Sequence, residues 1–151
     1  MAILSPKVKE QLEGRFGQRL TGPVQLRLYV RPGLGRLIVP GRYTCVTCDD
    51  ARELLGEVSA ASPELVTLEV TDLSAAPADG VEEVPTLVIG TPEEEEPRIR
   101  FQGLPAGYEF ATLVDAIERV SRGEPGLSPT SLERLALLAE PAEVMVFATP
   151  T

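Results

Sequence analysis

The sequence predicts an α/β domain followed by a short additional segment. Helical and strand patterns alternate along most of the chain, with apolar residues three or four positions apart in the first and two apart in the second. A Cys-x-x-Cys pair, Cys45 and Cys48, stands between the first strand pattern and the second helix pattern. A chain of 151 residues can bury its own core as one domain, or as one domain with a fragment of another.

The first two elements are a helix and a strand. A helix is expected over Ser5–Leu20, with Ser5 as N-cap and Pro6 at the first helical position. Its apolar face consists of Val8, Leu12, Phe16 and Leu20. Alternation from Val24 to Val30 predicts a strand. The turn-rich residues 31–36 and the apolar run 37–39 that follow fit either a hairpin or an extension of this strand.

A helix and a strand are expected directly after the cysteines. Residues 49–59 have the helical spacing, with Ala51, Leu54, Leu55 and Val58 on one face. Residues 65–70 alternate as a strand does. Residues 72–83 contain Pro77 and Gly80 and are expected to be irregular or to form at most a turn of helix. The connection to the next strand is too short for a full helix.

A hairpin and a helix are expected next. Strands over 84–90 and 98–101 flank a loop with four consecutive glutamates, Glu93 to Glu96, which we expect to be solvated. Residues 108–122 then predict a helix, which ends at Gly123 to Gly126. The stripe that this helix would bury consists of Phe110, Leu113, Val114, Ile117 and Val120.

The last 25 residues repeat the order of the first elements. A helix begins at Ser128 and carries Leu132, Leu135, Leu138 and Ala139. The run Val144–Phe147 predicts a buried strand, and the sequence ends at Thr149-Pro150-Thr151.

Composition excludes several classes of function. The net charge of −9 argues against nucleic acid and anionic membranes as partners. The chain has no histidine, which removes Cys-His and Ser-His nucleophile pairs and the usual His-rich metal sites. No apolar run is long enough to span a bilayer, and no leader pattern is visible, so a cytoplasmic location is expected. The bias toward Leu, Val, Glu, Arg, Pro and Ala hints at a thermophilic source.

The two cysteines are the strongest candidates for chemistry. A Cys-x-x-Cys pair entering a helix makes one thiol a reactive nucleophile, which its neighbour can resolve. A structural disulfide and half of a zinc site are the alternatives. Zinc needs four ligands, so with no other Cys or His such a site would require a second copy.

The order helix, strand, Cys-x-x-Cys helix, strand, strand, strand, helix resembles the thioredoxin fold. Val84-Pro85-Thr86 matches the cis-proline motif of that fold. The resemblance implies a central mixed four-stranded sheet flanked by helices, with the proline loop facing the cysteines. A plain proline at the start of a strand is the alternative explanation.

A narrower resemblance comes from residues 101–110, Phe-Gln-Gly-Leu-Pro-Ala-Gly-Tyr-Glu-Phe. This run is similar to a signature of the glutaredoxin-like protein disulfide oxidoreductases, which contain two thioredoxin-like units. The N-terminal domain of the flavoprotein component of alkyl hydroperoxide reductase is also similar. The resemblance implies one unit over residues 1–126 and the truncated start of a second, a helix and a strand, over 127–151. The second Cys-x-x-Cys of the family is missing from this sequence.

The resemblance also implies roles for individual residues. Cys45 would attack the substrate disulfide, since the positive end of the helix dipole favours its thiolate, and Cys48 would resolve the mixed disulfide that forms. Nearby charges have opposite effects on this thiolate: Arg42 and Arg52 would stabilise it, whereas Asp49 and Asp50 would destabilise it. The residues expected to line a substrate groove are Tyr43, Thr44, Val84, Pro85 and Thr86. Residues 33–41 are an insertion relative to the family pattern.

Three functions follow as expectations. The first is a thiol–disulfide oxidoreductase acting on protein dithiols and disulfides, with the Cys45–Cys48 disulfide in place of any cofactor or metal. The second is an electron relay or docking module for a peroxidase or a flavoprotein resembling thioredoxin reductase. The third is a structural half of a two-unit protein. In that case Val144–Phe147 would add to the unit's own sheet or pair with a second copy in a homodimer.

Overall fold

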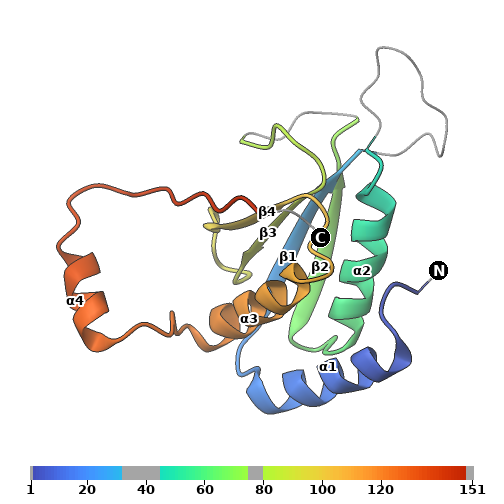
Figure 1. The fold of residues 1–151 in the computed structure, drawn as a ribbon, viewed down its shortest axis with the longest axis horizontal. Coiled ribbons are helices and arrows are strands. Elements are labelled where there is room, and N and C mark those ends of the chain that lie inside the picture. The colour runs from blue at the N-terminus through green and yellow to red at the C-terminus, as the bar shows by residue number, and fades with distance from the viewer. Residues whose placement is uncertain (1, 32–44, 75–79, 149–151) are drawn as a thin grey trace.

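The structure is a computed structural model that describes residues 2–31, 45–74 and 80–148. Its elements in chain order are α1 (Pro6–Arg19), β1 (Val24–Val30), α2 (Cys48–Ala60), β2 (Val66–Asp72), β3 (Thr86–Gly90), β4 (Ile99–Gln102), α3 (Glu109–Arg122) and α4 (Pro129–Ala136). Figure 1 shows α1, α2 and α3 packed with the sheet, whereas α4 stands apart from it. No helix among the described residues is long and apolar enough to cross a membrane.

The four strands form one mixed sheet in the order β2-β1-β3-β4. β1 runs parallel to β2 and antiparallel to β3, and β3 runs antiparallel to β4. α2 is the crossover between the two parallel strands, as a parallel pair requires. This arrangement confirms the predicted thioredoxin-like α/β fold and its β3–β4 hairpin.

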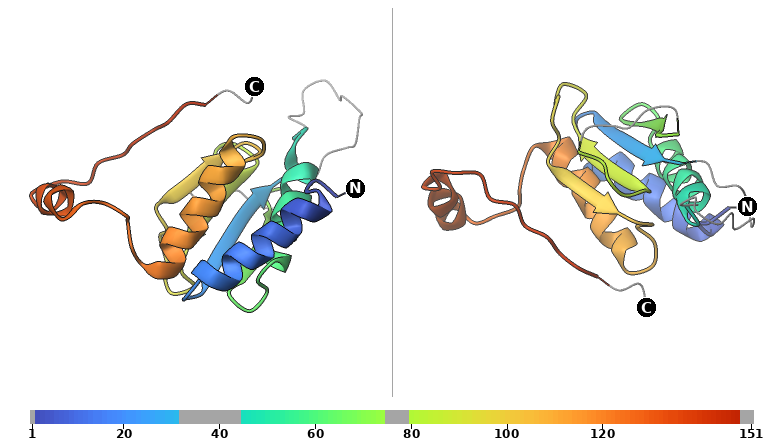
Figure 2. Two further views of the ribbon diagram at one scale, coloured as in Figure 1. Left: turned by 60° about the horizontal axis from the view of Figure 1, so that its bottom comes forward. Right: turned by 90° about the horizontal axis from the view of Figure 1, so that it is seen from above.

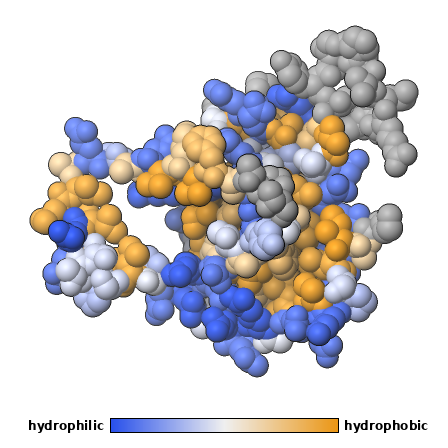
Figure 3. Space-filling view, viewed as in Figure 1, coloured by the Kyte–Doolittle hydropathy of each residue, from blue (hydrophilic) through white to orange (hydrophobic). Residues whose placement is uncertain are grey.

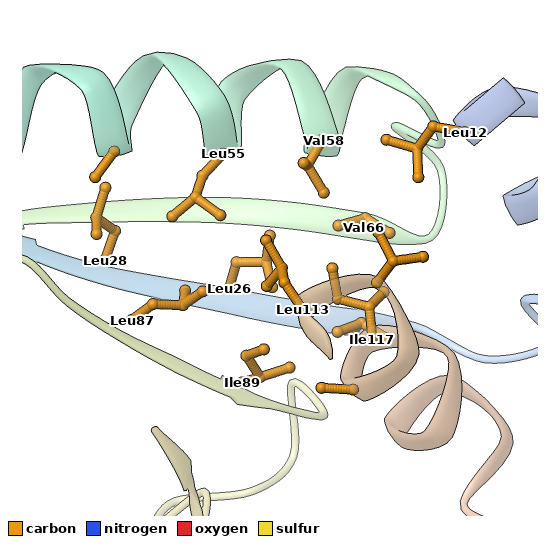
Figure 4. Close-up of a cluster of buried hydrophobic side chains, with 14 of the residues drawn as sticks. Leu12, Leu26, Leu28, Leu55, Val58, Val66, Leu87, Ile89, Leu113 and Ile117 are labelled. Carbon is orange, nitrogen blue, oxygen red and sulfur yellow. The ribbon is translucent and has the colours of Figure 1, made fainter. Parts of the chain in front are cut away.

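The core lies on one face of this sheet. Alternate residues of β1, Val24, Leu26, Leu28 and Val30, are buried, and Leu26 and Leu28 pair with Ile89 and Leu87 of β3. The same cluster takes in Leu12 and Phe16 from α1, Leu55 and Val58 from α2, and Leu113 and Ile117 from α3. Figure 4 shows the labelled members of this cluster, among them Leu12, Leu55 and Ile117, meeting between the helices and the strands. α1, α2 and α3 therefore cover this face, and the views in Figure 2 show them on the same side of the sheet.

The opposite face of the sheet is polar and has no helix over it among the described residues. It carries the other residues of β1, Gln25, Arg27 and Tyr29, which are only half-buried. The described parts of the β2–β3 connection, residues 73–74 and 80–85, form turns and bends, in agreement with the expected short crossover. Among residues 2–31, 45–74 and 80–148, helices thus flank the sheet on one side.

A buried carboxylate joins α1 to α3. Glu118 of α3 is 1% exposed and pairs with Arg15 and, at 3.3 Å, with Arg19 of α1. Hydrogen bonding to Glu118 raises the pKa of the Arg15 guanidinium against the opposing effect of burial. The apolar periodicity predicted this helix face correctly at Leu113, Val114 and Ile117 but gave no sign of the glutamate among them.

A second polar contact fixes the entry to β1. The Ser121 hydroxyl accepts hydrogen bonds from the Thr21 and Gly22 amides at 2.9 and 3.0 Å and donates one to the Gly22 carbonyl at 2.7 Å. A Cβ on Gly22 would lie 2.8 Å from the Ser121 carbonyl oxygen, so this close approach needs glycine. The end of α3 is thereby held against the turn that precedes β1.

The observed boundaries of the helices and strands differ from the predicted ones by a few residues at most. The Ser5 N-cap is confirmed, since its hydroxyl accepts from the Val8 amide at 3.3 Å. The third strand begins at Thr86 and not at Val84, because the two preceding residues form the bend around the proline. The glutamates of the loop between β3 and β4 are exposed, as expected.

The C-terminal segment, residues 127–148, confirms one prediction and corrects another. α4 begins after Ser128, whose hydroxyl accepts from the Ser131 amide at 3.2 Å. The buried strand predicted at Val144–Phe147 is wrong: these residues form no strand, and Phe147 is 91% exposed. A strand needs a neighbour to accept its backbone hydrogen bonds and cover its side chains, and none of the four described strands pairs with this run. Figure 3 also shows apolar surface over α4, where Leu132 and Leu135 are exposed.

Candidate functional site

The two cysteines form a disulfide at the start of α2. The Sγ atoms of Cys45 and Cys48 are 2.01 Å apart, and their Cα atoms are 5.5 Å apart. Cys48 is the first residue of the helix and is 2% exposed, whereas Cys45 precedes the helix and is half-buried. Of the two sulfurs, the one that the sequence analysis expects to attack therefore belongs to the more accessible residue.

The helix start gives the pair a mixed electrostatic environment. Thr47 occupies the N-cap position but makes no side-chain cap, so the first amides of α2 and the positive dipole end lie beside the disulfide. Asp49 and Asp50 stand exposed in the first turn and oppose a thiolate there. Arg52 is exposed one position after the buried Ala51.

The carboxylate of Asp72 lies at the end of the sheet where α2 begins. Asp72, the last residue of β2, pairs in register with Val30, the last residue of β1. The Ser74 amide donates to its carboxylate at 2.8 Å and lowers the pKa of Asp72, and attraction to Arg52 acts in the same direction. Arg52 therefore interacts with Asp72, and its charge is not reserved for the cysteines.

The proline segment approaches this end from β3. The Val84–Pro85 peptide bond is cis, as the sequence analysis expected. The Gly103 amide donates to the Pro85 carbonyl at 2.8 Å, and the Thr86 hydroxyl donates to the Glu83 carbonyl at 2.7 Å. Since Thr86 pairs with Tyr29 near the end of β1, the proline lies at the end of the sheet where α2 begins.

The predicted site residues divide into three groups. Cys48 belongs to the core cluster, and the half-buried Cys45 and Val84 pack against it. Pro85 and Thr86 are buried, so their side chains can hold the loop but offer little surface. Tyr43 and Thr44, like the insertion at 33–41, lie outside the described residues, and their groove-lining role stays a prediction.

Two exposed apolar residues at this end were missed. Val46, between the cysteines, is 87% exposed, and Tyr108, at the N-cap position of α3, is 83% exposed. Both follow motifs that the sequence analysis singled out, the first cysteine and the Gly-Leu-Pro-Ala-Gly run. Their proximity to those motifs was the available signal, but exposure could not be read from the pattern.

The fold and the site together define a class: a thioredoxin-like α/β unit that carries a Cys-x-x-Cys disulfide at the N-terminus of a helix. A protein disulfide oxidoreductase from Aeropyrum pernix k1 superimposes with a TM-score of 0.70, 26% sequence identity and 91% of this chain covered. Two structures of the alkylhydroperoxide reductase AhpF from Enterococcus faecalis (V583), one of them its NTD_N/C domain, have TM-scores of 0.70 and 0.69. Each is 22% identical, and they cover 89% and 87% of this chain.

The likeness extends over only part of each solved structure. The chain spans 56%, 61% and 59% of the lengths of those three chains. No protein-family model matches the sequence. No curated protein matches it either. The resemblance to the disulfide oxidoreductases noted from the sequence motifs therefore holds in three dimensions, and the family-level chemistry that it supports is thiol–disulfide exchange.

Proposed function

We propose that this chain exchanges dithiols and disulfides with protein substrates through Cys45 and Cys48. The observation that carries the proposal is the disulfide itself, in which half-buried Cys45 is bonded to buried Cys48 at the start of α2. The fold similarity to a protein disulfide oxidoreductase supports the same chemistry. A structural disulfide would not require one of its cysteines to stay half-buried at a helix N-terminus while the other is fully buried.

The exchange proceeds in two steps. In the reduced protein the Cys45 thiolate attacks a substrate disulfide, forms a mixed disulfide and releases one substrate thiolate, which takes up a proton. The Cys48 thiolate then attacks the Cys45 sulfur, releases the second substrate thiolate and closes the Cys45–Cys48 disulfide. Two electrons pass to the substrate, and the reverse sequence oxidises a substrate dithiol.

The surroundings of the disulfide fit an extended protein segment as substrate. The half-buried Val84 would present its backbone to a substrate chain, while Pro85 and Thr86 hold the loop from within. Exposed Val46 supplies an apolar contact beside the sulfurs. Tyr43 and Thr44 are proposed to line the same groove, as the family resemblance implies.

Insulin reduction by dithiothreitol tests the proposal. The chain should accelerate precipitation of the insulin chains, Cys45→Ser should abolish the acceleration, and Cys48→Ser should accumulate the mixed disulfide. Glu133→Gln on α4 is the surface control and should match the unaltered protein. In the reduced protein, iodoacetamide at neutral pH should label Cys45 before Cys48; faster labelling of Cys48 would reverse the assigned roles.

An electron relay for one dedicated partner is the second candidate. The fold similarity to the alkylhydroperoxide reductase AhpF favours a flavoprotein, of the thioredoxin-reductase kind, or a peroxidase as that partner. Rapid reduction of the Cys45–Cys48 disulfide by such a flavoprotein, with negligible insulin activity, would select this function over the first. Both functions suit a reducing cytoplasm, where a flavoprotein can regenerate the dithiol.

The C-terminal segment is proposed to be the start of a second unit, with the first unit ending near Gly126. Coverage of 91% of 151 residues is about 137 residues, so the aligned region includes part of residues 127–151. The exposed run Val144–Phe147 would then pair with strands absent from this chain or, in this chain alone, with a second copy. Light scattering should show a dimer that becomes a monomer when residues 127–151 are deleted; a monomer in both cases would rule out the homodimer.

A further inference from the structure

We propose that the open face of the sheet holds a binding site for a small oxyanion, a carboxylate or phosphate group, between Arg27 and Arg100. This site is separate from the disulfide and independent of the proposed redox function. It is a recess of about 370 Å³, within the lower part of the range for small-ligand sites. The two arginines, Tyr29 and Val88 line it together with two loops.

The sheet register brings the two arginines to the recess. Arg27 of β1 pairs with Val88 of β3, and Val88 pairs with Arg100 of β4. The three residues form a row across the polar face, so the arginine Cα atoms are two strand spacings apart, roughly 10 Å. Val88 is 5% exposed and forms the apolar floor between them.

Each guanidinium is anchored by a loop and keeps further N–H groups for a ligand. Arg27 donates to the carbonyls of Glu94 and Glu95 at 2.8 and 3.3 Å, and Arg100 donates to the carbonyl of Gly80 at 2.7 Å. A guanidinium has five N–H groups, so these bonds and the bond from Arg27 to Gln25 leave donors on both residues. The anchors fix where the two cations stand before a ligand arrives.

Neither arginine has a carboxylate partner among the described residues. The ion pairs formed there belong to Lys9, Arg15 and Arg19. Arg27 and Arg100 are bound instead to carbonyl oxygens, which carry only partial negative charge. Two positive charges beside a recess of this size favour binding of a carboxylate or phosphate, because guanidinium matches the geometry of these groups.

The glutamates of the nearby loop set a limit on the affinity. Glu95 and Glu96 line the recess, but both residues are exposed and their charges are screened by solvent. Glu94 is turned toward its own loop, where its carboxylate accepts from the Thr91 amide at 2.9 Å. The two exposed glutamates weaken the attraction for an anion without cancelling it, and they provide variants that should act in the opposite direction to those of the arginines.

Titration of the oxidised full chain by two-dimensional NMR tests this site. Inorganic phosphate and succinate are the two probes at low ionic strength, with sodium chloride as the control for non-specific charge screening. Saturable shifts are expected at Arg27, Val88 and Arg100, and not around Cys45. Saturation by both probes assigns the general oxyanion class, whereas saturation by one alone assigns phosphate or carboxylate.

Variants decide whether the two arginines carry the binding. Arg100→Gln should weaken it about tenfold, the loss expected for a charge-assisted hydrogen bond. The double variant Glu95→Gln and Glu96→Gln should tighten it about twofold, and Arg134→Gln on α4 should leave it unchanged. The chemical shifts of the free variants show whether each remains folded. Shifts that follow chloride equally well, or that survive Arg100→Gln in a folded protein, would overturn the proposal whatever the insulin assay shows.

Discussion

Two parts of this chain place the same kinds of side chain in opposite surroundings. In α1, α2 and α3 the apolar residues meet the sheet, and Phe16, Leu55 and Leu113 are no more than 1% exposed. In the C-terminal segment Leu135 is 49% exposed and Val146 is 86% exposed. Periodicity chooses which face of an element is apolar, but only a neighbouring element can bury it. The difference shows that an apolar pattern alone does not bury a segment, since no described residue of the C-terminal segment belongs to the core cluster.

The largest expected effect contrasts a core residue with its counterpart on α4. Phe16→Ala should lower the free energy of unfolding by about 3–5 kcal/mol, because it opens a cavity between α1 and the sheet. Leu135→Ala should change it by less than about 0.5 kcal/mol, as expected of an exposed position. Urea denaturation followed by circular dichroism measures both, and equal losses would mean that α4 is packed in solution.

The buried charge gives the next largest contrast. Glu118→Gln should cost about 2–3 kcal/mol, since it removes the anion that Arg15 and Arg19 share in a buried position. Glu133→Gln on exposed α4 should have an effect near zero. The same urea experiment compares them. A cost below about 0.5 kcal/mol for Glu118→Gln would show that Asp115, which also pairs with Arg15 at 2.6 Å, can replace it.

A pH-dependent contribution is expected from Glu57. Burial tends to raise the pKa of Glu57, but the Lys9 ammonium at 2.8 Å and the Leu4 amide at 2.8 Å outweigh it and lower the pKa below the ordinary value. The folded state then binds fewer protons than the unfolded state. The stabilisation is present above the ordinary glutamate pKa of about 4.3 and is lost as the pH falls through the lowered value.

Glu57→Gln should therefore cost less than about 1 kcal/mol at neutral pH, with the cost shrinking in acid. Thermal unfolding of the variant and the unaltered protein between pH 3 and pH 7 measures this convergence. Glu140, an exposed carboxylate of the C-terminal segment, offers the matched control Glu140→Gln. A cost that stays constant down to pH 3 would mean that the stabilisation does not come from the ionised carboxylate.

Removal of the C-terminal segment should have the smallest effect on the stability of the remaining unit. Deletion of residues 127–151 is expected to change the melting temperature of the first unit by no more than about 2 °C, because no core residue comes from that segment. Differential scanning calorimetry at low protein concentration avoids the contribution of self-association. A large drop in melting temperature would show that the segment covers the first unit in solution.

The parts of the fold that the sequence predicted well are those decided by local periodicity. All four residues expected on one face of the second helix, Ala51, Leu54, Leu55 and Val58, are buried. The strand over Val24–Val30 was predicted with its observed bounds, since alternation there continues without interruption. Local patterns also placed the hairpin and the end of α3 at Gly123, which has the left-handed φ of 64°.

The parts that the sequence did not predict depend on residues far away in the chain. Burial of Glu118 requires Arg15, about a hundred positions earlier, to stand opposite it. The strand expected at Val144–Phe147 had the right composition but no neighbour. The row of Arg27, Val88 and Arg100 exists only through the register of three strands. For the candidate site, motifs placed the cysteines and the proline at one end, but the exposure of Val46 and Tyr108 depended on packing that no motif encodes.

In the part of the chain that the structure describes, helices cover only one face of the sheet, so that part consists of one layer of helices and one layer of strands. A third layer added over the polar strands would not disturb the hydrophobic interior, since Gln25, Arg27 and Tyr29 take no part in it. Protein engineers could use this polar face to graft a helix or a sensor without altering the core or the disulfide at the start of α2.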